Sequence, residues 1–339
     1  MVNIKGYISS NFTKSFLTIF LPFFMIISLV YLVRISALTA KIQISFNELL
    51  LLYSYSIPDI VFYTLPLSFI TALANVLIKL SQDNELIALY ALGLPAKKVL
   101  KTLLVLGLLF SLLLLSISFL AMPLGKQFYK SFKEKKQAEA TLSIVPGTLG
   151  QKFGEYYIYV KEKNEDVLNN IVIYNRTDNA DEQFFSSQTG QIQNRENTVS
   201  LLLDEGYGYT YSKDRLQQAQ YKTLEVYNNL KTTGFKFEDI AAYWGQAKTN
   251  IKWMHKILFF IFTSLIPLLS VYLVASFTMI NPRYQSNRSF LVIFATTLLL
   301  YAIASSLEKW GTPLILGLSI FLFIILTQRL FAKRVSKYF

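Results

Sequence analysis

Few residues of this chain could do chemistry. It has no cysteine and a single histidine, His255, which excludes thiol catalysis, Cys-rich or His-based metal sites and a Ser-His-Asp triad. It also lacks a Walker A loop and a Gly-rich dinucleotide turn. We therefore expect no catalytic residue, no metal and no cofactor. What remains is charge placed at particular points of an apolar chain, above all Glu85, Arg34 and Lys41.

Glu85 belongs to a short polar segment, Ser81–Gly93, between two long apolar runs. Asp83 and Asn84 can cap a helix start, because their side-chain oxygens accept the free amide protons of the first turn. Glu85 then lies where a negative charge meets the positive end of the helix dipole. Gly93 can close the helix in the left-handed conformation. The segment 83–93 is thus predicted to be a short amphipathic helix, with an apolar face made of Leu86, Leu89 and Tyr90.

The composition indicates a membrane protein. Hydrophobic residues make up 53% of the 339 residues and charged residues 16%, against about a quarter in soluble proteins. Six stretches of 19 or more residues carry no charge, about the length needed to cross a bilayer core. The alternative, buried helices of a large soluble protein, rarely supplies six such runs. The six stretches are Ser15–Val33, Ile60–Ile78, Thr102–Gly125, Ile257–Pro282, Ser289–Leu307 and Trp310–Gln328.

The net charge of +12 is unevenly distributed. Between Gly125 and Lys252 there are 17 basic and 16 acidic residues, which leaves 16 basic and only five acidic residues elsewhere. Most of these flank the apolar runs, which is typical of cytoplasmic membrane margins and not of a nucleic-acid groove. We therefore expect both termini and the segment 83–93 to be cytoplasmic, and the insert after the third run to be outside. The basic residues on the cytoplasmic side are Lys5, Lys14, Lys79, Lys97, Lys98, Lys101, Arg283, Arg288, Arg329, Lys333, Arg334 and Lys337.

The insert, residues 126–250, has a different pattern. Alternating residues separated by turn-rich pieces, at a spacing of about 8–12 residues, predict an all-β sandwich or jelly roll. Its flanks, Lys126–Thr141 and Phe237–Lys256, are expected to be helical stalks. Its many tyrosines either line an apolar groove or pack an ordinary sandwich. The alternating runs are Tyr156–Val160, Leu168–Tyr174, Thr198–Leu203, Tyr207–Tyr211 and Leu224–Tyr227.

The predicted fold is therefore an α-helical membrane protein with six transmembrane helices and an all-β jelly-roll domain, outside the membrane, between helices three and four. Residues 1–125 would hold helices one to three with the helix 83–93, residues 126–250 the β domain with its stalks, and residues 251–339 helices four to six. The apolar segment Ile42–Pro58, interrupted by Glu48, would extend a helix or lie at the interface.

This layout resembles the LptF/LptG family of lipopolysaccharide-export permeases. The most specific stretch is Glu85-Leu86-Ile87-Ala88-Leu89-Tyr90-Ala91-Leu92-Gly93, which is similar to the Glu-Leu-x-x-x-x-x-x-Gly coupling helix of that family. The basic Arg34 late in the first run and the large insert after the third also have counterparts there. The stretches Val33-Arg34-Ile35 and Asn281-Pro282-Arg283 look more LptF-like than LptG-like.

The resemblance implies a permease subunit of the bacterial inner membrane that is not itself an enzyme. It would pair with a paralogous, LptG-like six-span subunit and bind a cytoplasmic, LptB-like ATPase dimer. Together they would extract lipopolysaccharide from the membrane and pass it to a periplasmic, LptC/LptA-like bridge.

Site roles follow from the same resemblance. Glu85 would meet a basic or polar groove on the ATPase, and Leu86 and Leu89 would fill its apolar part. Gly93 would end the coupling helix. The alternative is an interfacial helix lying on the membrane, with Glu85 merely solvated.

Arg34, at the external end of the first run, would pair with a lipid A phosphate, because its planar fork gives two charge-assisted hydrogen bonds. Lys41, two helical turns further on, could add a second contact. The alternatives are an arginine that snorkels to headgroups and a solvated loop lysine.

Three other functions remain open. A secondary carrier usually needs acids inside its spans, and none of the six runs has one. A membrane-anchored receptor or structural protein would need the β domain but no coupling helix. The third is an ABC permease for another lipid or a lipoprotein, although the β insert after the third run, rather than after the first, argues against the common lipoprotein-type layout.

Overall fold

The computed structural model describes residues 4–39, 44–142, 144–153, 156–164, 167–176, 182–195, 198–212, 215–227, 236–279 and 289–336. The chain forms two compact units. The helical unit comprises residues 1–35, 50–127 and 238–339, and the β unit comprises residues 36–49 and 128–237.

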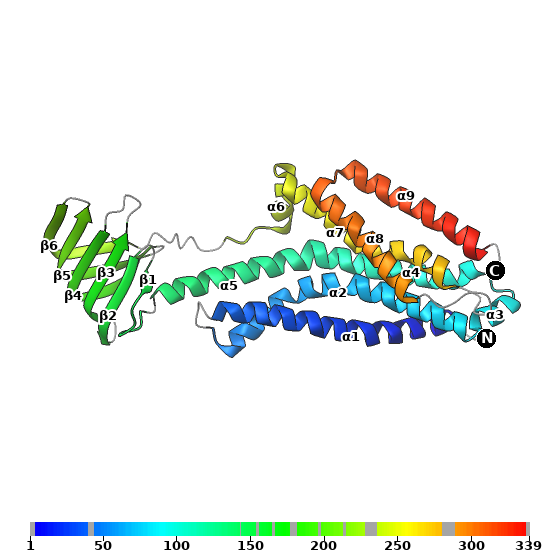
Figure 1. Cartoon of the computed structure of the whole chain (residues 1–339), viewed down its shortest axis with the longest axis horizontal. Coiled ribbons are helices and arrows are strands. Elements are labelled where there is room, and N and C mark those ends of the chain that lie inside the picture. Colours follow the sequence, from blue (N-terminus) through cyan, green and yellow to red (C-terminus); the bar gives the residue numbers. More distant parts are fainter. Residues whose placement is uncertain are drawn as a thin grey trace. The chain divides into compact units, whose positions relative to one another are not determined.

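Within the described ranges, six helices are long and apolar enough to cross a membrane, which confirms the prediction (Figure 1). The predicted extension of the second run is also found, because one helix runs through Glu48 and Pro58. The helices are α1 (Ile4–Thr39), α2 (Phe46–Gln82), α3 (Glu85–Ala91), α4 (Ala96–Ser116), α5 (Met122–Leu142), α6 (Ile240–Gly245), α7 (Ile251–Thr278), α8 (Ser289–Trp310) and α9 (Pro313–Phe331). Single π-helical turns join α4 to α5 (Ile117–Ala121) and follow α9 (Ala332–Ser336).

Helices α2 and α7 form the centre of the helical unit. In the most apolar stretch of each helix, 72% of the residues of α2 and 61% of those of α7 are buried, against 11% in α1 and 17% in α9. Helix α4 packs closely on α7, because Gly107 lets the backbone of Pro267 approach and Ser111 Oγ accepts a hydrogen bond from the Leu268 amide at 3.2 Å. That bond gives the Leu268 amide a partner beside Pro267, where the proline interrupts the backbone hydrogen bonds of α7. The large exposed apolar surfaces of α1, α8 and α9 are those that a membrane or a neighbouring subunit would cover.

A second close approach joins α2 to α5. A Cβ atom at Gly125 would lie only 2.4 Å from the carbonyl oxygen of Tyr55. In the next turn of the same contact, Lys126 Nζ lies 3.6 Å from Asp59 Oδ1. Lys126 Nζ also lies 5.7 Å from the ring centroid of Phe260 on α7. Three helices therefore meet at this point.

The β unit confirms the all-β domain between the third and fourth spans. Its strands pair with their chain neighbours, all antiparallel, in the order β1-β2-β3-β4-β5-β6 (Figure 1). The strands are β1 (Gln151–Phe153), β2 (Tyr156–Asn164), β3 (Val167–Arg176), β4 (Glu182–Arg195), β5 (Thr198–Ser212) and β6 (Arg215–Tyr227). One face of the sheet carries an apolar cluster of Phe153, Ile158, Val160, Leu168, Ile171, Ile173, Leu201, Leu203 and Val226.

The alternation of side chains shifts by one residue along a line that crosses the sheet. The buried positions nearest this line on either side are Leu168 and Ile171 on β3 and Leu203 and Gly206 on β5, and each pair is three residues apart. The intervening Asn170 (φ 54°) and Glu205 (φ 50°) have left-handed backbones, which non-glycine residues adopt uncommonly. The pairing register is unchanged across the line. The shift therefore changes which alternate positions face inward halfway along the strands, so that Leu168 and Ile171 both join the same apolar cluster without a register slip.

Two details of the β domain differ from the sequence-based expectation. The runs Thr198–Leu203 and Tyr207–Tyr211 belong to one strand, β5, because the shift at Glu205 interrupts the alternation without ending the strand. Strand β4 was not expected at all, since its Ser, Gln, Thr and Gly residues show no apolar alternation.

Only one of the two predicted helical stalks is continuous. Helix α5 extends the third span as expected. Before the fourth span, however, α6 ends at Gly245, a 3-10 turn follows, and α7 starts anew at Ile251. Asn250 causes the break, because its side chain accepts a hydrogen bond from the Lys252 amide and so caps α7 as an N-terminus.

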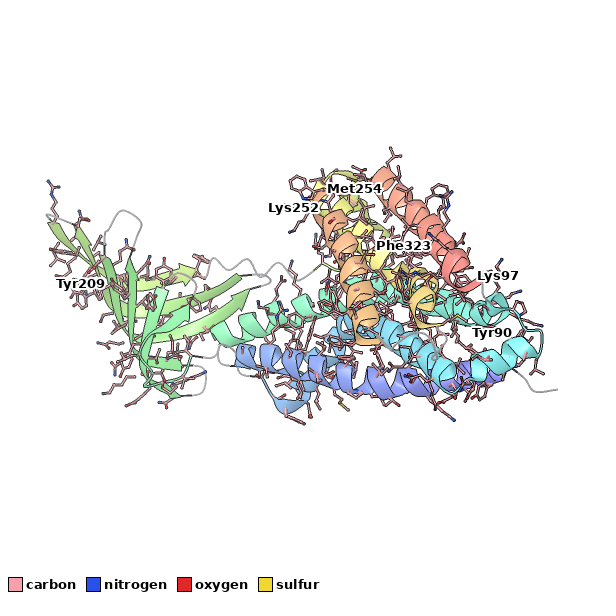
Figure 2. The ribbon with its side chains drawn as sticks, turned by 45° about the vertical axis from the view of Figure 1, so that its right-hand side comes forward. Tyr90, Lys97, Tyr209, Lys252, Met254 and Phe323 are labelled. Atoms are coloured by element: carbon pink, nitrogen blue, oxygen red, sulfur yellow. The ribbon has the colours of Figure 1, made fainter. Side chains whose placement is uncertain are left out.

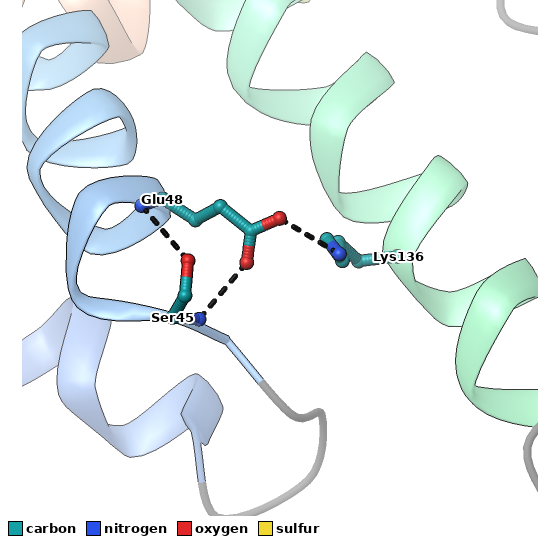
Figure 3. A network of polar contacts seen from close by, with 3 residues as sticks. All are labelled: Ser45, Glu48 and Lys136. Atoms are coloured by element: carbon teal, nitrogen blue, oxygen red, sulfur yellow. Dashed lines mark hydrogen bonds and ion pairs between the residues drawn. The ribbon is translucent and has the colours of Figure 1, made fainter.

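The start of α2 has a complete capping box (Figure 3). Glu48 Oε2 accepts from the Ser45 amide at 2.9 Å, and Ser45 Oγ accepts from the Glu48 amide at 3.4 Å. The other carboxylate oxygen of Glu48 lies 2.7 Å from Lys136 Nζ on α5. Glu48 is therefore a structural acid, which holds this helix start against the stalk.

The contact at Gly125 gives a direct test of the helix packing. We expect Gly125→Ala to destabilise the protein by about 1–3 kcal/mol, because the added methyl group meets a backbone oxygen that cannot rotate away. Gly317→Ala is the matched control, since a Cβ atom there meets nothing within 4 Å and alanine favours the helix. Thermal unfolding of the two purified variants in detergent measures the difference, and equal melting temperatures would contradict the packing argument.

Candidate functional site

The short helix α3 connects the second and third spans. The chain leaves α2 at Gln82 and turns through Asp83 and Asn84 into α3. The prediction of side-chain caps here was wrong, because Asn84 has a left-handed backbone (φ 59°) and makes no side-chain cap hydrogen bond. It serves as the residue that ends α2, where a left-handed conformation is common. At the other end Gly93 has φ 74°, which confirms its predicted role as the residue that closes the helix.

Glu85, the first residue of α3, is held by a residue far away in the sequence. The hydroxyl of Tyr7 on α1 lies 2.8 Å from Glu85 Oε2 and 2.9 Å from Oε1, and donates its proton to the carboxylate. A carboxylate has about four acceptor positions, so Glu85 can still bind a cation while Tyr7 holds it. The bond fixes the direction of the side chain and ties α3 to the first span.

The apolar residues of α3 divide into inward and outward groups. Leu86 is only 2% exposed and belongs to the core formed with α2, α4 and α7. Leu89 is half-buried and packs against the same core. Leu86 therefore does not fit the expected role of filling a partner's groove, because its own core already covers it. The large apolar side chains that point outward here are Ile87 on α3 and Leu92 just after it, which is 77% exposed.

The surroundings of α3 are basic. Figure 2 shows Tyr90 and Lys97 at one end of the helical unit, with Lys252 and Met254 near the opposite end. Lys79, Lys97, Lys98 and Lys101 are all exposed. Near them, Arg334 lies 4.3 Å from the ring centroid of Phe277 and so holds the turn after α9 against α7. Glu85 is thus an acid at a mostly basic end of the molecule.

Helix α1 connects the two predicted sites. Its first half is anchored by aromatic contacts, with ring centroids of Phe12 and Phe69 5.0 Å apart and those of Phe16 and Phe110 4.8 Å apart. Its second half exposes an apolar stripe that includes Met25, Leu29, Val30 and Val33. Arg34 is exposed at the end of this stripe, about 40 Å along the helix from Tyr7 at 1.5 Å per residue. Lys41 lies outside the described residues.

Sequence reasoning missed two features of these sites. Tyr7 carried no signal, because it precedes the first uncharged run and its partner lies 78 residues further on. Asp59 immediately precedes the second uncharged run, and its pairing with Lys126 was not predicted. The available signal was topological, since the start of one span and the end of the next antiparallel span must lie at the same membrane face.

Six membrane-length helices, an all-β domain between the third and fourth, and a short helix between the second and third define a multi-pass membrane protein with an inserted β domain. The chain belongs to the LptF/LptG family, described as lipopolysaccharide export system permease LptF/LptG, which it matches over residues 6–333. The comparison with curated proteins found no match. The chain is therefore an inner-membrane protein with a permease role in lipopolysaccharide transport.

The Tyr7–Glu85 hydrogen bond can be tested in the isolated subunit. We expect Tyr7→Phe to speed amide hydrogen exchange in α3 about fivefold, because a hydrogen bond of roughly 1 kcal/mol that restrains the helix is lost. Glu85→Gln, which keeps an acceptor oxygen for Tyr7, should have a smaller effect. Unchanged exchange in Tyr7→Phe would show that the bond does not restrain α3.

Proposed function

We propose that this chain is the transmembrane subunit of an ABC transporter in which α3 receives the force of a separate ATPase. Glu85 supports this proposal most directly. It is a partly exposed acid at the start of a helix that Leu86 fixes to the protein core and Tyr7 fixes to α1. A short, rigid, charged projection of this kind suits a partner groove that has a basic rim.

The proposed partner is a soluble, LptB-like ATPase dimer. A cation of the ATPase would bind the free acceptor positions of Glu85, and Ile87 and Leu92 would contact apolar surface beside it. Closure of the ATPase dimer would then move α3. Because Leu86 and Tyr7 join α3 to the core and to the first span, the movement would reach the spans without a flexible step.

The distribution of charge supports an orientation in the membrane. Lysines and arginines cluster at the α3 end, where the positive-inside rule predicts cytoplasm. We therefore place both termini and α3 in the cytoplasm and the β domain in the periplasm. In this orientation, residues 1–125 and 251–339 form the two membrane domains, and residues 126–250 form the periplasmic domain.

Lipopolysaccharide would be bound between this subunit and a paralogous, LptG-like subunit. The exposed apolar stripe of α1 is a surface that acyl chains or the second subunit could cover. Arg34 at its end, with Lys41 beyond it, would pair with the phosphates of lipid A. The β domain would then pass the lipid to an LptC/LptA-like bridge. The LptF-like stretches of the sequence favour the LptF position in the pair.

Loss of the acid at position 85 tests the role of α3. We expect Glu85→Lys to abolish co-purification of the ATPase, because a like charge replaces the group that binds its cation. Asp83→Lys makes the same charge change two residues away and should keep most of the ATPase bound. Co-purification with Glu85→Lys at the wild-type level would disprove the proposal, provided that both variants insert into the membrane.

Arg34→Glu tests the lipid site. We expect photocrosslinking of lipopolysaccharide from a probe at Val33 to fall at least several-fold, because a carboxylate repels the phosphate. Arg329→Glu, the same change at the opposite membrane face, should leave crosslinking intact. Equal crosslinking in wild type and Arg34→Glu would indicate that Arg34 only contacts headgroups.

A further inference from the structure

The outer face of the β sheet carries a hollow of about 330 Å³ that none of the roles above uses. It lies at the line where the side-chain alternation shifts. Its lining residues come from β2, β3, β4 and β5. Strands β3, β4 and β5 have a neighbour on each side, whereas β1 pairs with β2 only over Tyr156–Ile158. They are Tyr159, Lys161, Asn170, Ile171, Val172, Ser186, Ser187, Gln188, Glu205, Gly206 and Tyr207.

A row of side chains across four strands gives the hollow its shape. Tyr159 pairs with Val172, Val172 with Ser186, and Ser186 with Tyr207. The two tyrosines therefore stand about 14 Å apart, three strand spacings, with two small side chains between them. Tyr207 is 42% exposed, so much of its side chain is open to a ligand. The result is a trough with an aromatic side chain at each end.

The alternation shift places a second row beside the first. Asn170 and Glu205 take left-handed backbones, and both side chains are exposed, as are those of Lys161 and Gln188. In a regular strand every second residue faces the same way. Asn169 and Asp204 would then face inward beside Ile171 and Gly206. The shift instead buries Leu168 and Leu203 and leaves a row of amide, carboxylate and ammonium groups beside the tyrosines.

Specific contacts hold the backbone conformation at the shift. Gly206 has no room for a side chain, because Tyr221 crosses it on the inner face and donates a hydrogen bond to the Ser186 carbonyl at 3.0 Å. Burial raises the pKa of Tyr221, so the hydroxyl keeps the proton that it donates. On the same line, Ser187 Oγ lies 2.5 Å from the Asp204 carbonyl oxygen. The hollow is therefore a fixed feature of the sheet and not a gap between mobile side chains.

The residues that line the hollow indicate which class of ligand it can bind. Val172 is the main apolar side chain on its outer floor, too little to hold an acyl chain. One lysine and one glutamate balance each other, so the hollow has no excess positive charge to select a phosphate. A peptide that adds a strand pairs with the backbone of a sheet edge, whereas this hollow lies on the face of the sheet and offers side chains of β2 to β5. Exposed aromatic rings beside amides and single charges instead suit a neutral polyhydroxylated ligand, since its C–H faces stack on the rings and its hydroxyls bond the polar groups.

We propose that this hollow binds carbohydrate, in particular the sugar portion of the transported lipopolysaccharide. This inference rests on the proposed function, and it adds that the outer face contacts sugar while other surfaces contact lipid. The volume is at the lower end of the roughly 300–1,000 Å³ typical of small-molecule sites, and the hollow is open. The affinity is therefore weak, with a Kd on the order of 1 mM, which would let the sugar chain pass onward.

Saturation-transfer NMR with the core oligosaccharide, released from lipopolysaccharide by mild acid, tests the proposal. The full chain is used in lipid nanodiscs, because maltoside detergents carry a competing sugar. We expect transfer to the oligosaccharide from the wild-type chain, and a fall of at least about fivefold in Tyr159→Ala and Tyr207→Ala. Tyr157→Ala and Tyr211→Ala are matched controls, since these exposed tyrosines (42% and 54%) lie outside the hollow, and they should bind as the wild type does.

Absence of transfer in the wild type, or equal losses in all four variants, would overturn the sugar site. Lipopolysaccharide that co-purifies with the same preparation is measured separately by mass spectrometry. If the lipid co-purifies but the oligosaccharide does not bind, the sugar site is wrong and the proposed function stands. If the oligosaccharide binds at the two tyrosines but no lipopolysaccharide co-purifies, the site is supported and the proposed function is contradicted.

Discussion

The close approach of α2, α4, α5 and α7 is the constraint on which the helical unit depends. In a bilayer, apolar side chains gain little by leaving lipid for protein, so association relies on tight packing and on polar contacts between helices. Gly107 and Gly125 provide the tight packing, and Ser111 and the Asp59–Lys126 pair provide the polar contacts. The remaining spans, α1, α8 and α9, lie on this core and keep broad apolar surfaces for lipid or a second subunit.

The same core determines what the short helix α3 can do. A helix of seven residues has little stability of its own, yet α3 lies between the left-handed Asn84 and Gly93 and inserts Leu86 into the core. Its orientation is therefore inherited from α2 and α4. The bond from Tyr7 adds α1 to this group. A force on Glu85 would thus act on three spans together, as the proposed coupling to an ATPase requires.

The sequence predicted features that depend on local composition. The six spans follow from uncharged length, and the turn at Gly93 follows from the conformational freedom of glycine. It did not predict features decided by distant residues. The periodicity of Leu86 showed an apolar face but not that the protein's own core would cover it. Tyr7 could not be paired with Glu85 without the fold. Strand β4 is polar because it lies inside a sheet whose neighbours supply most of the apolar face, so its own residues give no alternation.

The line of shifted alternation in the β sheet has a consequence for how this domain can vary. In an ordinary meander, a strand can slide by two residues and still present the same face. Here such a slide would set the left-handed Asn170 and Glu205 against regular positions of their neighbours and would expose Leu168 or Leu203. The line therefore fixes the alignment of β3 to β6 during folding. Insertions and deletions inside the strands would break it, so differences in length between related chains should be confined to the connecting turns.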